Sequence, residues 1–86
     1  MSEIAVDAAR IRWRCRRGVK ELDVLLERFV EECLPKMPRE QVRVFDHLLD
    51  ESDLDLLDWV IGRTLPPALD YFPLIEMLRS LKEVKS

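Results

Sequence analysis

The sequence predicts an all-α protein: a single small domain folded as a compact bundle of five helices. Only two of the 86 residues are glycine and 48% are hydrophobic, which is too few glycines for a turn-rich β-protein and too apolar for a disordered chain. Apolar residues recur at intervals of three and four, the period of an amphipathic helix. Prolines and glycines separate these periodic stretches, as expected for short helices joined by turns.

The first two helices are expected on either side of Gly18. Apolar residues between Ala8 and Cys15 share one side of the first helix, and Gly18 is expected to end that helix as a left-handed cap. The second helix starts at residue 20 or 21 and continues to Pro35. Its apolar positions keep the helical spacing and are Leu22, Leu25, Leu26, Phe29 and Cys33.

The third and fourth helices are marked by residues typical of helix ends. Pro38 suits the first turn of the third helix, because proline has no N–H group to leave unpaired there. Ser52 and Asp53 are natural N-cap residues for the fourth helix. A glycine at position 62 ends that helix.

The C-terminal part of the chain is expected to form a loop and one more helix. The stretch 64–71 contains two adjacent prolines and is predicted to be a loop. Pro73 opens the fifth helix. The whole chain, residues 1–86, forms one domain, with residues 1–6 and 83–86 frayed.

Composition and charge exclude several classes of protein. Fourteen basic and 17 acidic side chains give a net charge of −3 and a pI near 5.1, so the whole chain has no general attraction to nucleic acid or to an anionic membrane. No apolar run approaches the roughly 20 residues that span a bilayer, and the N-terminus does not resemble a secretory signal. We therefore expect a cytoplasmic protein with reduced thiols and no membrane insertion.

The chemistry-bearing residues do not form a recognisable catalytic or metal-binding pattern. Cys15 and Cys33 fall on apolar faces, which favours inert buried thiols, and with the single His47 they are too few for a zinc site. His47 has no Ser or Cys partner at a recognisable spacing and is expected at the surface. The chain has no phosphate-binding glycine loop, dinucleotide fingerprint or nucleophile elbow. We expect no enzyme activity and no bound metal.

An acidic stretch lies between Asp46 and Asp58, with six carboxylates and no lysine or arginine. Its spacing does not match a calcium-binding loop. Asp53 and Asp55 are instead expected to stabilise the start of the fourth helix through capping and the helix dipole. Trp59 has apolar neighbours and is expected in the core.

The basic segment Arg10–Lys20 is the most informative part of the chain. It holds six basic residues and no acidic one, although residues 22–86 carry eight basic and fourteen acidic side chains. Either its arginines form a solvated helix face or they bind an acidic partner. Trp13 lies opposite the apolar side, and Trp and Arg are enriched at binding hot spots, which favours a partner. The alternative is that Trp13 packs under another helix.

Arg17, Gly18 and Glu21 suggest a contact of their own within this segment. A glycine at a tight turn lets a partner backbone approach closely, and the Arg17 guanidinium offers a fork for a carboxylate or a carbonyl. Glu21 either joins that contact or accepts hydrogen bonds from the free N–H groups at the start of the second helix. The pattern Arg-Gly-x-x-Glu is too short to decide between these roles.

Taken together, these residues resemble a known family, the succinate dehydrogenase assembly factors, also called SdhE-like flavinylation factors. The Arg-Gly-x-x-Glu motif has Arg10 and Trp13 before it and Leu22-Asp23 after it at the family spacing. A second block resembles the family's leucine pair, acidic turn and Asp-Leu-x-x-Trp, and consists of Leu48-Leu49, Asp53, Asp55-Leu56 and Trp59. The resemblance extends from Ala9 to Leu81. Val19 replaces a common methionine, and the prolines before the last helix are a second departure.

The resemblance implies a bundle of five helices and a role as a chaperone. Members of the family bind the flavoprotein subunit of succinate dehydrogenase, and often that of fumarate reductase, and promote covalent attachment of FAD by the subunit's own chemistry. This chain would then be a monomer with no catalytic residue and no stably bound cofactor. The partner-binding residues would be Arg10, Trp13, Arg17, Gly18 and Glu21, with Asp53, Asp55 and Trp59 as a structural motif.

The basic segment leaves one alternative function open, a small nucleic-acid-binding or antitoxin-like helical regulator. The pI and the lack of a second basic element argue against it.

Overall fold

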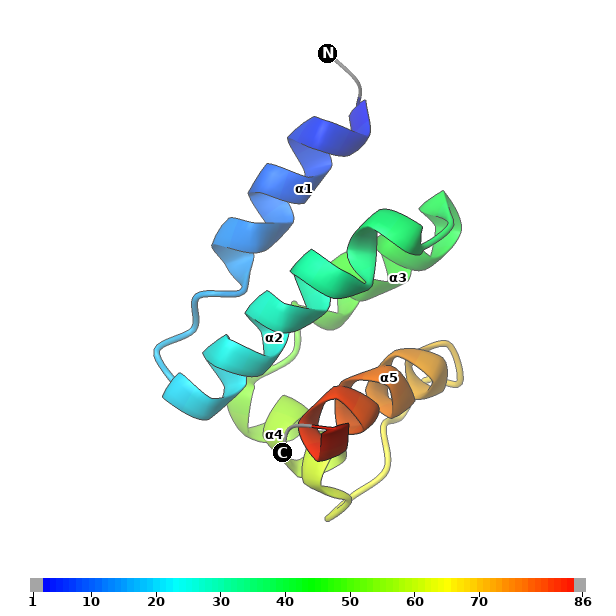
Figure 1. Cartoon of the computed structure of the whole chain (residues 1–86). Coiled ribbons are helices and arrows are strands. Elements are labelled where there is room, and N and C mark those ends of the chain that lie inside the picture. The colour runs from blue at the N-terminus through cyan, green and yellow to red at the C-terminus, as the bar shows by residue number, and fades with distance from the viewer. Residues whose placement is uncertain (1–2, 85–86) are drawn as a thin grey trace.

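Five α-helices and one short 3-10 helix form the computed structural model, which describes residues 3–84 and the side chains of residues 8–82 (Figure 1). In chain order they are α1 (Glu3–Arg14), α2 (Lys20–Glu32), η1 (Leu34–Lys36), α3 (Arg39–Leu48), α4 (Asp53–Ile61) and α5 (Tyr71–Val84). No strand occurs among the described residues. The predicted all-α class and the five-helix bundle are confirmed.

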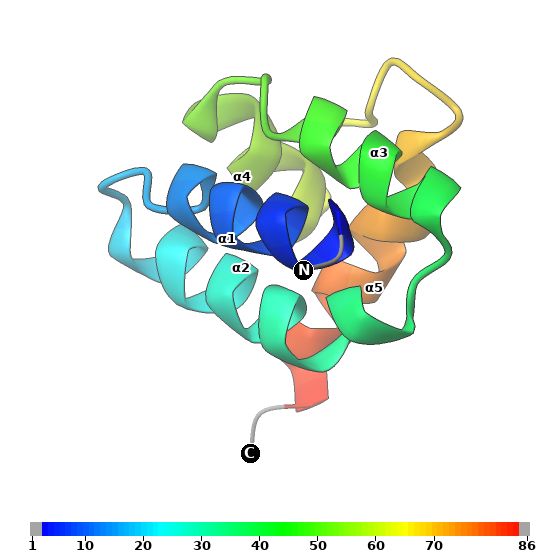
Figure 2. The ribbon, with the colours of Figure 1, turned by 90° about the horizontal axis from the view of Figure 1, so that it is seen from above.

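Helix α2 forms the middle of the bundle. Helix α1 runs beside it in the opposite direction, and α3 lies next to both (Figures 1 and 2). Helix α5 packs against α2, α3 and α4. The two ends of the chain are thus joined to the same central helix.

The core is built from the apolar faces that the helical spacing predicted. The rings of Phe29 and Phe45 lie 4.6 Å apart between centroids, and those of Trp59 and Tyr71 lie 5.9 Å apart. Trp59 is buried, as predicted. The most completely buried side chains come from all five helices and include Ile11, Leu22, Leu26, Leu48, Leu56, Leu74 and Leu78.

The ends of α4 agree with the prediction from its capping residues. The Ser52 hydroxyl accepts a hydrogen bond of 3.1 Å from the Asp55 N–H, which satisfies one donor at the start of the helix. Gly62 ends the helix in the left-handed conformation, with φ of +84°, as glycine does most readily.

The predicted end of α1 at Gly18 is wrong. The helix stops at Arg14, and Gly18, with φ of +90°, lies in the loop 15–19. The cause is Asp23, whose carboxylate accepts hydrogen bonds from the Arg17 N–H at 2.9 Å and the Gly18 N–H at 3.1 Å. These bonds pair backbone donors that a continued helix would pair internally.

Two further predicted boundaries differ slightly from the structure. Pro38 is the N-cap of α3 and therefore precedes its first turn. Helix α5 begins at Tyr71, two residues before Pro73, which lies in the first turn where a missing N–H costs nothing. The expectation that residues 1–6 and 83–86 are frayed stays a prediction. The backbone is helical from Glu3 and up to Val84, and residues 1–2 and 85–86 lie outside the described residues.

Candidate partner-binding surface

The basic segment and the acidic stretch of the sequence meet in the folded chain. Arg10 pairs with Asp46 through Nη2 and Oδ2 at 2.8 Å. Arg14 pairs with Asp46 and Asp50, and its Nη1 also donates to the Asp46 carbonyl at 2.9 Å. The acidic partner of these two arginines is therefore the C-terminal part of α3 and the turn after it in the same chain. Neither of the interpretations left open by the sequence contains this arrangement.

Arg17 makes the most extensive of these contacts. Its guanidinium donates to the Leu49 carbonyl at 2.9 Å and the Glu51 carbonyl at 2.6 Å, and its Nε pairs with Asp53. Because only 14% of the side chain is exposed, these groups are its main surroundings. The carbonyls after α3 have no partner within that helix, so Arg17 satisfies them and ties the loop 15–19 to the turn between α3 and α4.

The paired carboxylate of Asp46 responds to two opposing effects. Burial disfavours its ionised form, but hydrogen bonds and charge from Arg10 and Arg14 outweigh burial and lower the pKa of Asp46 below its ordinary value. The carboxylate is held ionised in the folded protein.

Trp13 lies on the outer side of α1, with 71% of its surface exposed. The alternative that it packs under another helix is wrong. The guanidinium carbon of Arg16 lies 5.9 Å from the centroid of the Trp13 ring, within the range of a cation–π contact. An exposed tryptophan beside an arginine is the kind of surface that protein partners cover.

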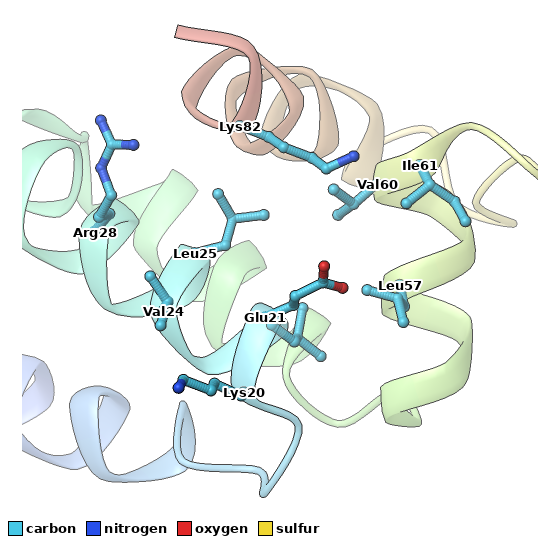
Figure 3. A pocket seen from close by; sticks show the side chains of 10 residues that line it. Lys20, Glu21, Val24, Leu25, Arg28, Leu57, Val60, Ile61 and Lys82 are labelled. Carbon is cyan, nitrogen blue, oxygen red and sulfur yellow. The ribbon is translucent and has the colours of Figure 1, made fainter. Parts of the chain in front are cut away.

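Gly18 and Glu21 lie on either side of the start of α2. A Cβ placed on Gly18 would find no atom within 4 Å, so its positive φ, rather than crowding within the chain, favours glycine there. Glu21 is exposed in the first turn of α2, whose N-cap, Val19, makes no side-chain cap hydrogen bond. The Glu21 carboxylate points into a groove between α2 and α4 (Figure 3).

The five predicted site residues therefore lie in different surroundings. The guanidinium group of Arg10 contacts Asp46 of α3, and that of Arg17 contacts Asp53 at the start of α4. Trp13 and Gly18 are exposed, and Glu21 lines the groove. Sequence reasoning missed Asp23 as the organiser of the loop, although its position five residues after Gly18, on the first turn of α2, was a usable signal.

The thiols and the histidine occupy the kinds of position that their surroundings in sequence predicted. Cys15 is buried, and burial raises the pKa of its thiol to about 11. Cys33 is half-buried, and burial raises the pKa of its thiol as well. His47 is exposed. Among residues 3–84 no three His, Cys, Asp or Glu side chains group as a metal site would require, and no helix is long and apolar enough to cross a membrane.

The exposed Trp–Arg pair and the open apolar groove of this small helical bundle are surfaces of the kind that protein partners cover. The chain is a member of the family described as the flavinator of succinate dehydrogenase, whose profile matches residues 9–82. This match confirms the resemblance predicted from the two sequence blocks.

Several curated proteins are similar to this chain over most of its length. The FAD assembly factor SdhE of Coxiella burnetii is 40% identical over 72 residues, which cover 84% of this chain and 88% of that protein. The FAD assembly factor SdhE of Vibrio vulnificus is 40% identical over 72 residues, 84% of each chain. The protein of the same name from Idiomarina loihiensis is 45% identical over 60 residues, 70% of this chain and 67% of that one.

Proposed function

We propose that this chain is an assembly factor that binds the flavoprotein subunit of succinate dehydrogenase in the cytoplasm and promotes covalent attachment of FAD to it. The observation that carries the proposal is the family match over residues 9–82, together with relatives named FAD assembly factors along most of the chain. The proposal includes the same role toward the flavoprotein subunit of fumarate reductase.

The chain would act by binding, without chemistry of its own. It would bind the conformation of the immature subunit in which FAD and the acceptor side chain are correctly placed, and so raise the population of that conformation. The size of this change in population is limited by the difference between the chain's affinity for this conformation and its affinity for the other conformations of the subunit. FAD would be held by the subunit, and the bond would form through the subunit's own groups.

The five predicted residues would have different roles in binding the client. Trp13, Gly18 and Glu21 would contact the client, with Gly18 allowing its backbone to approach closely. Arg17 would act chiefly by holding the loop in place, because its guanidinium is occupied by the carbonyls of Leu49 and Glu51. Arg10, whose side chain is half exposed, would extend the contact.

The comparisons do not support the alternative of nucleic-acid binding. Four of the six basic residues of the segment Arg10–Lys20 already pair with carboxylates of the same chain. Phosphate contacts would have to displace these carboxylates before neutralising any charge on the nucleic acid.

Covalent flavin on the client tests the proposed function directly. The flavoprotein subunit is produced in cells that lack their own assembly factor, together with this chain, its Gly18→Arg variant, its Gly18→Ala variant, or none. Flavin fluorescence on a denaturing gel measures the covalent bond. We expect the wild type to restore flavinylation and Gly18→Arg to abolish it, because the long side chain would stand between the loop and the client.

Gly18→Ala is the matched control for backbone strain. Both variants place a Cβ at φ of +90°, which costs about 1 to 2 kcal/mol of folding stability, but alanine adds almost no bulk. We expect both to unfold at similarly lowered urea concentrations and only Gly18→Arg to lose activity. Full activity of Gly18→Arg would show that the loop is not the contact surface. Absence of flavinylation with the folded wild type and added FAD would exclude this client.

A further inference from the structure

A groove of about 630 Å³ runs between the first half of α2, the second half of α4 and the end of α5 (Figure 3). This volume lies within the range of about 300 to 1,000 Å³ that is usual for ligand sites. Its floor and walls are apolar and consist of Leu22, Val24, Leu25, Leu57, Val60 and Ile61. The helices that form it come from three separate parts of the sequence.

Some of the apolar side chains that line the groove are exposed to water. Val24 is 52% exposed and Ile61 is 43% exposed, although Leu25 and Val60 beneath them are buried. Side chains of this kind gain about 25 cal/mol for each Å² of apolar surface that a partner covers. Because they lie together along one groove, a single partner segment can cover both.

The rim of the groove is basic in a chain that is acidic overall. Lys20, Arg28 and Lys82 line it against one carboxylate, that of Glu21. Arg28 is engaged, donating to Glu32 and to the Leu81 carbonyl at 3.2 Å each. Lys20 and Lys82 form no ion pair with any residue of the described part of the chain, so their ammonium groups are available to an acidic partner.

We propose that this groove binds an amphipathic segment of the flavoprotein client, whose apolar side chains cover Val24 and Ile61 and whose acidic side chains pair with Lys20 and Lys82. The proposal rests on the proposed function and extends it. Two residues of the groove, Lys20 and Glu21, belong to the same short stretch as Gly18, so one client could contact the loop and the groove together. The Glu21 carboxylate, which points into the groove, would accept a hydrogen bond from the bound segment (Figure 3).

The experiment measures the affinity of the purified flavoprotein subunit for the full chain by titration calorimetry. The double variant Lys20→Glu/Lys82→Glu reverses two of the three positive charges on the rim, and Val24→Asp places a carboxylate on the apolar wall. Lys36→Glu is the matched control, since it reverses an exposed lysine of η1 outside the groove. Circular dichroism verifies that each variant is folded.

We expect both groove variants to bind at least about tenfold more weakly than the wild type and Lys36→Glu to bind like it. The effect of the double lysine variant should shrink in about 1 M salt, which screens charges beyond roughly 3 Å, whereas that of Val24→Asp should persist. Wild-type affinity in both groove variants would overturn the groove proposal and leave the proposed function standing if Gly18→Arg still blocks flavinylation.

A photoreactive amino acid at Val24 identifies the occupant. A cross-link to a client segment that combines apolar and acidic residues is expected. A cross-link to a second copy of the chain, with a dimer in sedimentation, would overturn the assignment to the client. If the wild-type chain does not bind the subunit at all, the proposed function fails together with the groove.

Discussion

At the scale of single residues, Arg17 stabilises the junction between the two halves of the chain. It provides donors for two carbonyls at the end of α3 and a charge for Asp53, from a loop that lies more than thirty residues earlier. A planar guanidinium can serve three acceptors at once, which a lysine ammonium on a flexible stem does less well. Arg17 is thus a structural residue as well as part of the motif.

Replacing Arg17 with methionine should lower the free energy of unfolding by about 2 to 4 kcal/mol, because it leaves two carbonyls and a carboxylate without their partner. Urea unfolding followed by circular dichroism measures the change. Arg16→Met is the control: its side chain is exposed and lies over the Trp13 ring, so a loss below about 0.5 kcal/mol is expected. Equal stability of the two variants would mean that water replaces the Arg17 contacts at no cost.

The sequence predicted some of these residue positions and missed others. The place of Trp13 opposite the apolar side of the helix favoured its exposure, with packing under another helix as the alternative. The partners of Arg17 did not follow from the sequence, since pairing it with Asp53 requires knowing that the loop 15–19 and the turn after α3 are neighbours. The charge pattern did contain the information, because a basic segment and an acidic stretch in one small domain attract each other.

At the scale of elements, α1 depends on charge for its attachment more than the other helices do. Its described side chains contribute only Ile11 to the buried core, whereas α2 contributes five residues. Its ion pairs with Asp46 and Asp50 therefore carry a large share of its contacts with α3. The helix should be sensitive to conditions that weaken those pairs.

The pH dependence of stability tests this attachment. The pKa of Asp46 is lowered in the folded protein, so its contribution is complete above its unfolded pKa of about 4 and is lost as the pH falls through the lowered folded value. The stability difference between the wild type and Asp46→Asn should be constant near neutral pH, shrink below about pH 4 and vanish in strong acid. Urea midpoints across this range measure it.

Glu27→Gln is the control for the loss of one negative charge, since Glu27 is exposed and forms no ion pair within the described residues. Its difference from the wild type should stay small at every pH. A difference for Asp46→Asn that is equally large in acid would show that Asp46 acts through packing and that its charge is unimportant.

Helix boundaries were predictable where a local capping signal decides them and failed where a side chain from another element intervenes. Ser52 and Gly62 act on their own helix, and the predicted limits of α4 were right. The end of α1 depends on Asp23 of α2, which accepts from the loop N–H groups. The helix propensities of residues 15–18 do not indicate that a carboxylate from another helix competes for their N–H groups.

At the scale of the whole molecule, the five helices enclose a core in which Cys15 is a useful reporter. Its side chain is 3% exposed, and burial raises the pKa of its thiol to about 11. Both effects reduce the thiolate that a reagent can reach. Reaction at this position therefore requires the fold to open.

In a Cys33→Ser variant, Cys15 should react with a disulfide reagent at pH 8 at least about a hundredfold more slowly than a free cysteine. The rate should rise to that of the free thiol when urea unfolds the protein. In the companion Cys15→Ser variant, the half-buried Cys33 should react faster in the folded state. Equal rates for the two thiols in the folded protein would contradict the burial of Cys15.

The fold class could be predicted from composition and helical period because both are properties of the chain itself. The groove could not, because Val24, Leu57 and Lys82 become neighbours only when α2, α4 and α5 pack together. Glu21 was predicted to contact a partner, but its surroundings in sequence gave no indication of the groove that it lines.

The pairing of early arginines with later carboxylates has a consequence for the nascent chain. Arg17 precedes Asp53 by 36 residues, and Arg10 precedes Asp46 by the same distance. At about 5 to 20 residues per second, roughly 2 to 7 s of translation separate the arginines from their partners. The arginines of α1 and of the loop after it therefore leave the ribosome before their partner carboxylates have been synthesised, and α1 docks on α3 only after α3 has emerged.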